Sequence, residues 1–453
     1  MFFSMLFGKL QWILSSEAGC CKNFPPDYEG AACGRDNAQC RRQSRGGVNP
    51  IHDQMTYLDW AASSPPEPAA LDEAREVAAL FFANPSSPHA AGRAAEEKLS
   101  QLRARCAKSL GIEPKELIFT SGGTESNTAL LLALLDRHRL GGVERQKARI
   151  VTTAIEHSSV YEQAQGLQGH GIACTVVRPR PDGRVSPEEL GEALSDDTVM
   201  VSAMLVNNET GAIQDVAAFA RVVREHSRRK GRRILVHTDA VQALAKIPLS
   251  LRGLDVDAAS FSGHKIGAPR GIGALYVRAG NAPGFLSLGG GQEAGRRPGT
   301  ENLPGIAAFT AALELRLARL PADVTGAQAR AQRLIEGLRE IRGAWVLPLA
   351  REGGSDPRFS PWIVSAGFPP LPAEVVVRTA DEAGFFIASG AACSSKKKDR
   401  TRVPESMGLP LETARCMIRI STGPSTSIES IDAFIAMMQR VIPPLAAIAR
   451  GRA

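Results

Sequence analysis

From Tyr57 onward, short apolar runs rich in β-branched residues alternate with longer stretches in which apolar positions recur at helical spacing. The runs have the length of buried strands, and the stretches between them have the length of helices. This alternation predicts an α/β fold in which a large, mostly parallel sheet is covered by helices on both faces. The predicted strands are 117–120, 149–153, 173–177, 199–206, 234–238, 257–261 and 271–277, the last of which should close the sheet, and the predicted helices are 124–137, 158–169, 187–195 and 215–230.

The pattern changes near residue 300, where one long helical stretch replaces the short alternation. The elements that follow lack the regular repeat, which is typical of a smaller α+β domain. We therefore predict an extension at 1–50, a large α/β domain at 51–310 and a small C-terminal α+β domain at 311–453. From the long helix onward the predicted helices are 301–341, 372–383 and 427–448, and the predicted strands are 361–366, 385–389 and 416–421.

The extension at 1–50 shows no structural period, and we expect it to be disordered. Its first 15 residues are apolar but too short to span a bilayer, and no basic segment precedes them as in a secretory signal. A short amphipathic anchor is the alternative. The extension holds Cys20, Cys21, Cys33 and Cys40, but without the close pairs of a zinc site, so we predict no metal.

Composition narrows the class of protein further. Of the 453 residues, 43% are hydrophobic and 22% are charged, which excludes a wholly disordered chain. The net charge of +7 is small for this length, so it suggests anionic partners without requiring nucleic acid. Eight cysteines are too few for a disulfide scaffold of this size, which favours a reducing compartment and a cytoplasmic location.

Polar residues follow most of the predicted strands, and in open parallel sheets ligands bind beyond these strand ends. Gly122, Gly123 and Thr124 follow strand 117–120 and begin a helix, an arrangement that can bind a phosphate. His157 follows strand 149–153 and could stack on an aromatic ligand or move protons. Asn208 follows strand 199–206 and could bind a ligand oxygen. Taken singly, the glycine pair and His157 fit ordinary structural roles better, namely a strand–helix turn with a helix cap and a capping or surface histidine, and a turn is the alternative for Asn208.

Two charged residues follow the next strands. Asp239 directly follows strand 234–238, where a buried carboxylate needs a metal, a basic side chain or a protonated ring nitrogen as partner. Lys265 follows strand 257–261, and a desolvated lysine can form a Schiff base. A salt bridge and a lysine extended to solvent are the ordinary alternatives. Together with the phosphate cradle and the histidine, however, these groups are what pyridoxal phosphate requires.

Several longer motifs carry a family resemblance. They are YLDWAAS (57–63), NPSSPH (84–89), TSGGTES (120–126), EHSSV (156–160), VNNETG (206–211), HTDAVQ (237–242), SFSGHKI (260–266), RRPGTEN (296–302) and SGAACSS (389–395). In this order and spacing the sequence resembles the cysteine desulfurases, pyridoxal-phosphate enzymes of the class V aminotransferase group. The likeness runs from about Tyr57 to Ile442.

The resemblance implies a role for each matching residue. Lys265 would hold the cofactor covalently, Asp239 would pair with its ring nitrogen and His157 would stack on its ring. Arg419 would bind the substrate carboxylate as a bidentate fork, with Asn84 near it. The remaining cofactor contacts would be Asn208 and Gln242 near the ring hydroxyl, Gly123, Thr124, Ser262 and His264 at the phosphate, and Thr300 at the phosphate of a neighbouring subunit, which implies a homodimer.

Cys393 would be the catalytic nucleophile, with its thiolate favoured by the basic residues at 396–400. The implied reaction converts L-cysteine to L-alanine and leaves a persulfide on Cys393. The sulfur would pass to an acceptor, such as an iron–sulfur scaffold protein or a thiol carrier, for iron–sulfur cluster assembly or tRNA thiolation. We expect no direct nucleic-acid binding and no membrane span.

Three alternatives share these residues: a selenocysteine lyase, a cysteine sulfinate desulfinase and a sulfur-transfer subunit with reduced catalysis.

The chain also departs from the family in three places. The extension at 1–50 is additional, the basic run at 396–402 is heavier than expected, and Trp60 replaces the smaller or polar residues often found at its position.

Overall fold

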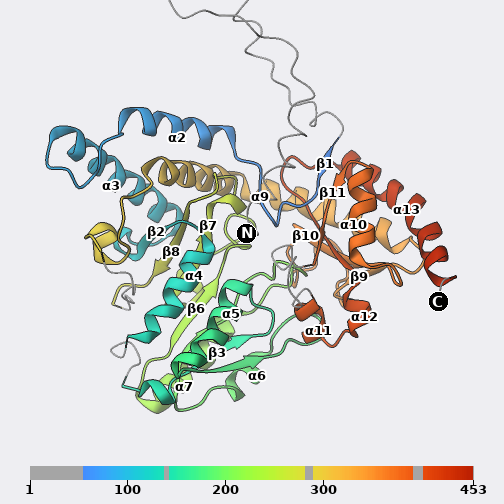
Figure 1. Cartoon of the computed structure of the whole chain (residues 1–453), viewed down its shortest axis with the longest axis horizontal. Coiled ribbons are helices and arrows are strands. Elements are labelled where there is room, and N and C mark those ends of the chain that lie inside the picture. Colours follow the sequence, from blue (N-terminus) through green and yellow to red (C-terminus); the bar gives the residue numbers. More distant parts are fainter. Residues whose placement is uncertain (1–54, 137–141, 281–288, 391–400, 452–453) are drawn as a thin grey trace, which may run out of the picture. The chain divides into compact units, whose positions relative to one another are not determined.

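The computed structural model describes residues 55–136, 142–280, 289–390 and 401–451. The predicted extension at 1–50 and the predicted nucleophile Cys393 lie outside these residues. The central element is a seven-stranded sheet in the order β2-β8-β7-β6-β5-β3-β4 (Figure 1). Only β8 runs antiparallel to its neighbours in this sheet, so the predicted α/β class with a mostly parallel sheet is confirmed. The strands are β2 (Leu117–Thr120), β3 (Arg149–Thr153), β4 (Ala173–Val177), β5 (Thr198–Ser202), β6 (Leu235–Asp239), β7 (Ala258–Ser262) and β8 (Gly273–Val277).

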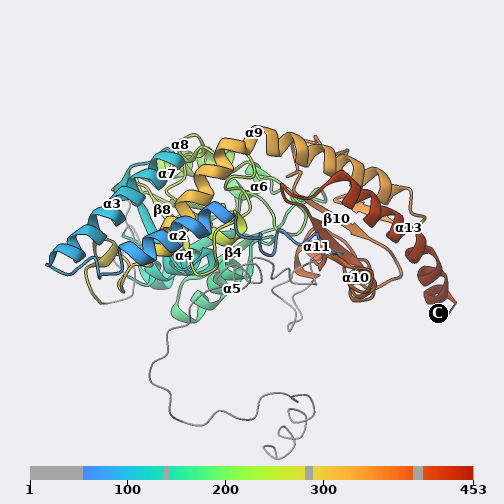
Figure 2. The ribbon, with the colours of Figure 1, turned by 90° about the horizontal axis from the view of Figure 1, so that it is seen from above.

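Helices cover both faces of this sheet because side chains on neighbouring strand positions point to opposite faces. Phe119 belongs to one buried cluster with residues of α2, α3, α7 and α9, whereas Ile118 belongs to another with residues of α4 and α5. In Figure 2, α7 and α5 lie on opposite sides of the sheet. These helices are α2 (Pro68–Leu80), α3 (Ala90–Leu110), α4 (Gly123–Leu132), α5 (Ser158–Gly166), α7 (Val216–Lys230) and α9 (Leu303–Arg339); the shorter α6 (Pro187–Glu192) and α8 (Leu251–Leu254) complete this part.

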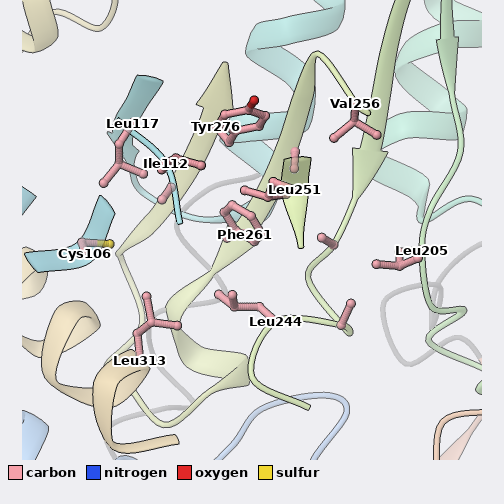
Figure 3. Close-up of a cluster of buried hydrophobic side chains, with 14 of the residues drawn as sticks. Cys106, Ile112, Leu117, Leu205, Leu244, Leu251, Val256, Phe261, Tyr276 and Leu313 are labelled. Carbon is pink, nitrogen blue, oxygen red and sulfur yellow. The ribbon is translucent and has the colours of Figure 1, made fainter. Parts of the chain in front are cut away.

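The larger of the two clusters fills the space between the sheet and α3, α7 and α9. Figure 3 shows Phe261 and Tyr276, from the adjacent strands β7 and β8, on the same side of the sheet as Leu313 of α9. Both aromatic rings are fully buried. Burying each such side chain stabilises the fold by about 1.5–3 kcal/mol, so this layer anchors the strands whose ends carry the site.

Three predicted strands, 117–120, 149–153 and 173–177, match β2, β3 and β4 residue for residue. Two predictions need correction. Segment 271–277 does not close the sheet, because β8 lies between β2 and β7 and pairs antiparallel with both. Strand β5 ends at Ser202 instead of 206, although Ala203 and Leu205 still donate to carbonyls of β6 before Val206 pairs with Ile213.

A smaller antiparallel sheet of four strands, in the order β12-β13-β10-β9, forms the second part. The predicted strand 385–389 is two short strands, because β11 pairs in parallel with β1 while β12 joins the small sheet. The strands are β1 (Thr56–Tyr57), β9 (Trp345–Leu347), β10 (Ile363–Gly367), β11 (Phe385–Phe386), β12 (Ala388–Ser389) and β13 (Met417–Ser421), and the helices are α10 (Ala373–Glu382), α11 (Arg402–Ser406), α12 (Leu411–Ala414) and α13 (Ile428–Arg450).

Two helices of this region bear on the predicted organisation. The predicted domain boundary at 310 falls inside α9, which packs on α2 and α3 at one end and on β9, β10 and α13 at the other. Among the described helices, α13 has the length and hydropathy of a membrane span. Its residues Phe434, Ile435 and Met438 are buried in the core of the small part, which is the pattern of a core helix in a water-soluble domain.

Candidate active site

A cavity of about 370 Å³ opens where the C-terminal ends of β2, β3, β5, β6 and β7 meet. It lies at the edge of the sheet where a ligand was expected. Most of the residues predicted from the strand ends and from the family motifs line it, namely Gly123, Thr124, His157, Asn208, Asp239, Gln242, Ser262, His264, Lys265 and Arg419.

One wall of the cavity is the N-terminus of α4, which begins at Gly123. A Cβ atom at Gly123 would lie 2.7 Å from the Val241 side chain, so this close approach of backbone requires glycine. Thr124, Ser262 and His264 line the same wall. Burial and the nearby Lys265 lower the pKa of His264 to about 4, so its ring is neutral at pH 7.

The predicted cofactor lysine lies in a short 3₁₀ turn, η6 (Gly263–Lys265), directly after β7. Its Nζ donates to the backbone oxygens of Ala61 and Ala62, at 2.7 Å and 2.6 Å. The segment that supplies these carbonyls belongs to the motif YLDWAAS and is about 200 residues away in the sequence. The N-terminal motif therefore positions the lysine amine in the cavity.

Asp239 and His157 lie in one hydrogen-bonded network. Asp239 is 4% exposed, and its Oδ1 accepts from the backbone N–H of Val241. Its Oδ2 accepts from Asn127 Nδ2 at 2.7 Å. Asn127 Nδ2 also donates to Ser159 Oγ at 2.9 Å, and Ser159 Oγ lies 2.8 Å from His157 Nδ1. Sequence analysis did not identify Asn127, which occupies an ordinary helical position in α4.

Gln242 is fixed from both ends of its amide. Its Nε2 donates to Ala61 O at 2.9 Å, and its Oε1 accepts from Lys246 Nζ at 2.7 Å. Lys246 is only 5% exposed, and burial together with neighbouring cations lowers its pKa well below 10.5. This buried lysine, which sequence analysis missed, holds the Gln242 amide so that its second N–H can face the cavity.

Arg419 is almost fully buried and forms an ion pair across the fold. Its Nη2 donates to Asp59 Oδ1 at 2.6 Å, and its Nη1 donates to the backbone oxygen of Asn208 at 3.0 Å. Its Nε has no hydrogen-bond partner among the described residues. The predicted carboxylate fork is therefore anchored by Asp59, which the sequence did not single out.

Five further ionisable residues, which sequence analysis did not single out, line the cavity: Glu125, Glu156, Glu209, Arg270 and Arg402. Burial raises the pKa of Glu156 to about 8 and that of Glu209 to about 7. Arg402, at the start of α11, donates to the backbone oxygens of Ala154 and Glu156 and lies 4.1 Å above the Tyr161 ring. This guanidinium attaches α11 to the loop that follows β3.

Three predicted site residues are not part of this cavity as described. Asn84 and Thr300 are exposed and do not line it, and Asn84 Oδ1 accepts from Ser86 N. Cys393 lies in the segment 391–400, outside the described residues, between β12 and α11. The roles of these three residues remain predictions.

The described cysteines differ from a reactive thiol. Cys106, Cys174 and Cys416 are unpaired. Burial raises the pKa of Cys106 to about 12 and that of Cys174 to about 11, and it also raises that of Cys416. At neutral pH these thiols are protonated and poor nucleophiles.

Comparison with known proteins places this geometry in a family. The sequence profile of the family Aminotransferase class-V matches residues 56–434. The cysteine desulfurase IscS of Methanosarcina thermophila is 31% identical over 393 residues, which cover 87% of this chain and 93% of that protein. The chain is a member of the cysteine desulfurase family of class-V aminotransferases. Cysteine desulfurase 2 of Trichormus variabilis is 34% identical over 394 residues, which cover 87% of this chain and 94% of that protein.

A solved structure agrees with this membership. The structure of a NifS-like protein superposes with a TM-score of 0.77 at 32% identity, covering 85% of this chain and 99% of that one. The resemblance inferred from the motifs is thus confirmed at the level of the family, and so is the fold.

Enzymes of this family depend on pyridoxal phosphate, and the residues of the cavity fit this cofactor. The N-terminus of α4, kept open by Gly123, suits a phosphate, and the Lys265 amine suits an aldehyde. Asp239 offers a buried carboxylate to a ring nitrogen. Asn208 Oδ1 is buried without a hydrogen-bond partner among the described residues, as expected for an atom that faces a bound polar group.

Proposed function

We propose that this enzyme removes the sulfur of L-cysteine, transfers it to Cys393 and releases L-alanine. The observation that carries the proposal is the meeting of Asp239 from β6, Lys265 from the turn after β7 and Arg419 from β13 of the small sheet in one cavity. Cysteine desulfurase is the activity of the family, and the identity of the sulfur-accepting residue is the part proposed for this chain.

Each side chain has a distinct task in this reaction. Arg419, oriented by Asp59, binds the substrate carboxylate. Asp239 holds a proton at the ring nitrogen of the cofactor, and Lys265 Nζ takes the proton from the substrate Cα. Pyridoxal phosphate, when bound, supplies an aldehyde for the substrate amine and a ring that withdraws electrons from Cα.

The sulfur transfer is balanced without an external oxidant. The Cys393 thiolate attacks the sulfur of cysteine, an S–S bond forms and the C–S bond breaks. The sulfur is oxidised to the persulfide level while the substrate β-carbon is reduced to the methyl group of alanine. Two protons reach the substrate carbon skeleton overall, one at Cβ and one returned to Cα, and Lys265 is placed to return the second.

We further propose a homodimer in the cytoplasm that passes its sulfur to an acceptor protein, such as an iron–sulfur scaffold or a thiol carrier. The exposure of Asn84 and Thr300 outside the cavity of their own subunit supports roles in the cavity of a second subunit. The unpaired cysteines at 106, 174 and 416 support a reducing compartment. Sedimentation velocity tests whether the protein is a dimer. Mixing Thr300→Ala subunits with Lys265→Ala subunits tests whether Thr300 acts in the cavity of the neighbouring subunit.

The enzymatic proposal is tested with Lys265→Ala and Cys393→Ser. We expect Lys265→Ala to form no alanine from L-cysteine. Cys393→Ser should still bind the cofactor and change its absorption on adding L-cysteine, yet yield almost no alanine or transferable sulfur, because a hydroxyl cannot form a persulfide. Mass spectrometry after a single turnover should place the extra sulfur on Cys393 in the unsubstituted protein.

Sulfur on another cysteine, or full activity of Cys393→Ser with L-cysteine, would refute this assignment. If Cys393→Ser retained activity with selenocysteine or cysteine sulfinate alone, the result would favour a lyase or desulfinase acting without the thiol.

A further inference from the structure

The hydrogen bonds between Asp239 and His157 run through two residues to which the family motifs assign no role. Asn127 is 1% exposed, and both hydrogens of its amide nitrogen form hydrogen bonds inside the site. One is donated to Asp239 Oδ2 and the other to Ser159 Oγ. The carboxylate requires a donor, so the amide nitrogen must face it. The orientation of the Asn127 side chain is therefore determined by its partner.

The network also determines which ring nitrogen of His157 carries the proton. His157 is the N-cap of α5, and its Nδ1 accepts from the backbone N–H of Ser159 at 3.1 Å. An imidazole nitrogen that accepts a hydrogen bond carries no proton, so the neutral ring holds its proton on Nε2. The Ser159 hydroxyl, which accepts from Asn127, is then free to donate its own hydrogen to the same Nδ1 at 2.8 Å.

We propose that Asn127 and Ser159 are positioning residues that link Asp239 to His157 and keep His157 as the neutral tautomer with its proton on Nε2. We call this pair the Asn127–Ser159 relay. Two donors converge on Nδ1, and protonation of Nδ1 would break the bond to the Ser159 backbone that caps α5. The relay thus presents an Nε2–H donor, instead of a base, to the cavity that His157 lines.

The inference rests on the proposed function for its meaning in catalysis, but its geometry can be tested separately. Asn127→Asp keeps the shape of the side chain, and beside Asp239 the two buried carboxyl groups should share one proton. The new carboxyl oxygen can then donate that one hydrogen to Asp239 but has no second hydrogen for Ser159. The Ser159 hydroxyl should therefore donate to the new carboxyl group, and its oxygen should accept from His157. We expect the His157 proton to move from Nε2 to Nδ1.

Ser159→Ala removes the hydroxyl but keeps the backbone N–H that caps α5, so His157 should keep its proton on Nε2. The double variant Asn127→Asp/Ser159→Ala should also keep it there, because the hydroxyl that transmits the change is absent. Ser202→Ala is a matched control, since Ser202 Oγ lies 2.8 Å from Nδ1 of the buried His237, outside the cavity. It should alter the signals of His237 alone.

The experiment is nitrogen NMR of the full chain with ¹⁵N-labelled histidine, with and without pyridoxal phosphate, assigned with His157→Asn. Movement of the proton in Asn127→Asp and its reversal in the double variant support the relay. An unprotonated Nδ1 in Asn127→Asp, or a protonated Nδ1 in the double variant, overturns it. If Asn127→Asp does not fold, a protonated Nδ1 of His157 in the unsubstituted protein overturns the relay by itself.

Kinetics tests whether the relay positions His157 for turnover. We expect Asn127→Asp to lower kcat for alanine formation by about tenfold to a hundredfold with little change in KM, and the double variant to recover part of the loss. An inverted tautomer with unchanged kcat would overturn the positioning role. A failure of the unsubstituted protein to form alanine from L-cysteine would instead refute the proposed function, and it would leave the NMR result intact.

Discussion

Arg419 and Asp59 form a 2.6 Å ion pair that joins β13 to the segment just after β1, 360 residues away in the sequence. The pair fixes a guanidinium that is 2% exposed. Asp59→Ala would leave Nη2 as well as Nε without a partner, so the fork would lose its orientation. We expect KM for L-cysteine to rise about tenfold, which corresponds to about 1.4 kcal/mol of binding energy.

Steady-state kinetics checks this prediction, with alanine as the product measured. Asp59→Asn keeps an acceptor for Nη2 and should have an intermediate KM. Glu412→Ala is the control, because it removes an exposed ion pair with Arg415 on the same part of the chain. It should change neither KM nor kcat. A KM for Asp59→Ala equal to that of the unsubstituted protein would show that Arg419 needs no anchor.

Glu156 gives a prediction for the pH dependence of stability. Burial, with a smaller effect of the nearby Asp239, raises the pKa of Glu156 from 4.5 to about 8. Between these values the folded state binds more protons than the unfolded state, so this residue's contribution to stability falls as the pH rises. Glu156→Gln mimics the protonated form and lacks this dependence. Relative to this variant, the unsubstituted protein should lose roughly 1–3 kcal/mol between pH 5.5 and 8.

Urea unfolding of the cofactor-free proteins at several pH values measures this difference. Glu116→Gln is the control: Glu116 is also buried, but its hydrogen bonds with Ala279 and Glu113 and its pairing with Arg252 lower its pKa. The contribution of the ionised Glu116 to the free energy of unfolding no longer changes once the pH is well above 4.5. The difference in this free energy between Glu116→Gln and the unsubstituted protein should therefore stay constant from pH 5.5 to 8. A constant difference for Glu156→Gln as well would contradict the prediction.

Lys246 is a buried lysine whose amine donates to Gln242 in the cavity, and burial lowers its pKa well below 10.5. Lys246→Met keeps the volume and removes the amine donor. Because burying a polar or charged group is costly, we expect the free energy of unfolding of the cofactor-free protein to be equal or higher. The Gln242 amide would lose one of its two anchors, so the Kd for pyridoxal phosphate should rise about threefold to tenfold.

Fluorescence titration with pyridoxal phosphate and urea unfolding give the two quantities for Lys246→Met. Lys230→Met, which removes an exposed pair with Asp196, should leave the Kd unchanged. An unaltered Kd for Lys246→Met would mean that Gln242 is held well enough by Ala61 alone.

Gly423 packs against the ring of Trp60, the residue that departs from the family pattern. A Cβ at Gly423 would lie 2.1 Å from two ring atoms of Trp60, far inside van der Waals contact. Gly423→Ala should therefore cost about 1–3 kcal/mol of stability and weaken cofactor binding, because Trp60 adjoins Asp59 and Ala61. Thermal unfolding and the cofactor Kd check this. Gly166→Ala meets no atom within 4 Å and should be neutral or slightly stabilising.

The strand ends were predictable from sequence because their signal is local. Asp239 and Lys265 are charged residues directly after buried apolar runs, and the structure places both in the cavity. Asp59 and Arg402 gave no such signal, since their partners lie 360 and more than 240 residues away and only the fold brings them together. Lys246 and Asn127 look like ordinary surface residues until their burial is known.

The same contrast holds for the fold. Buried parallel strands such as β3 appear in the sequence as continuous runs rich in apolar and β-branched residues, and β3 was predicted to the residue. Strands β1 and β11 are two residues each, too short to show alternation, and their pairing is set by the tertiary structure. The position of β8 in the sheet also could not be predicted from its own residues. An antiparallel strand between parallel strands has the same hydrophobic composition as its neighbours.

The pairing of β1 with β11 also dictates when the active site can form during synthesis. Residues 56–62 leave the ribosome early, yet their partners are Phe385, Phe386 and Ser421, more than 300 residues later. Contacts of such high sequence separation form late in folding. The large sheet can assemble while the chain is still growing, but the carbonyls that hold Lys265 and the carboxylate that holds Arg419 take their places only after the segment from Phe385 to Ser421 has been synthesised. Cofactor capture in its final geometry therefore waits for that segment, and truncation before Arg419 would impair a site whose lysine lies far upstream.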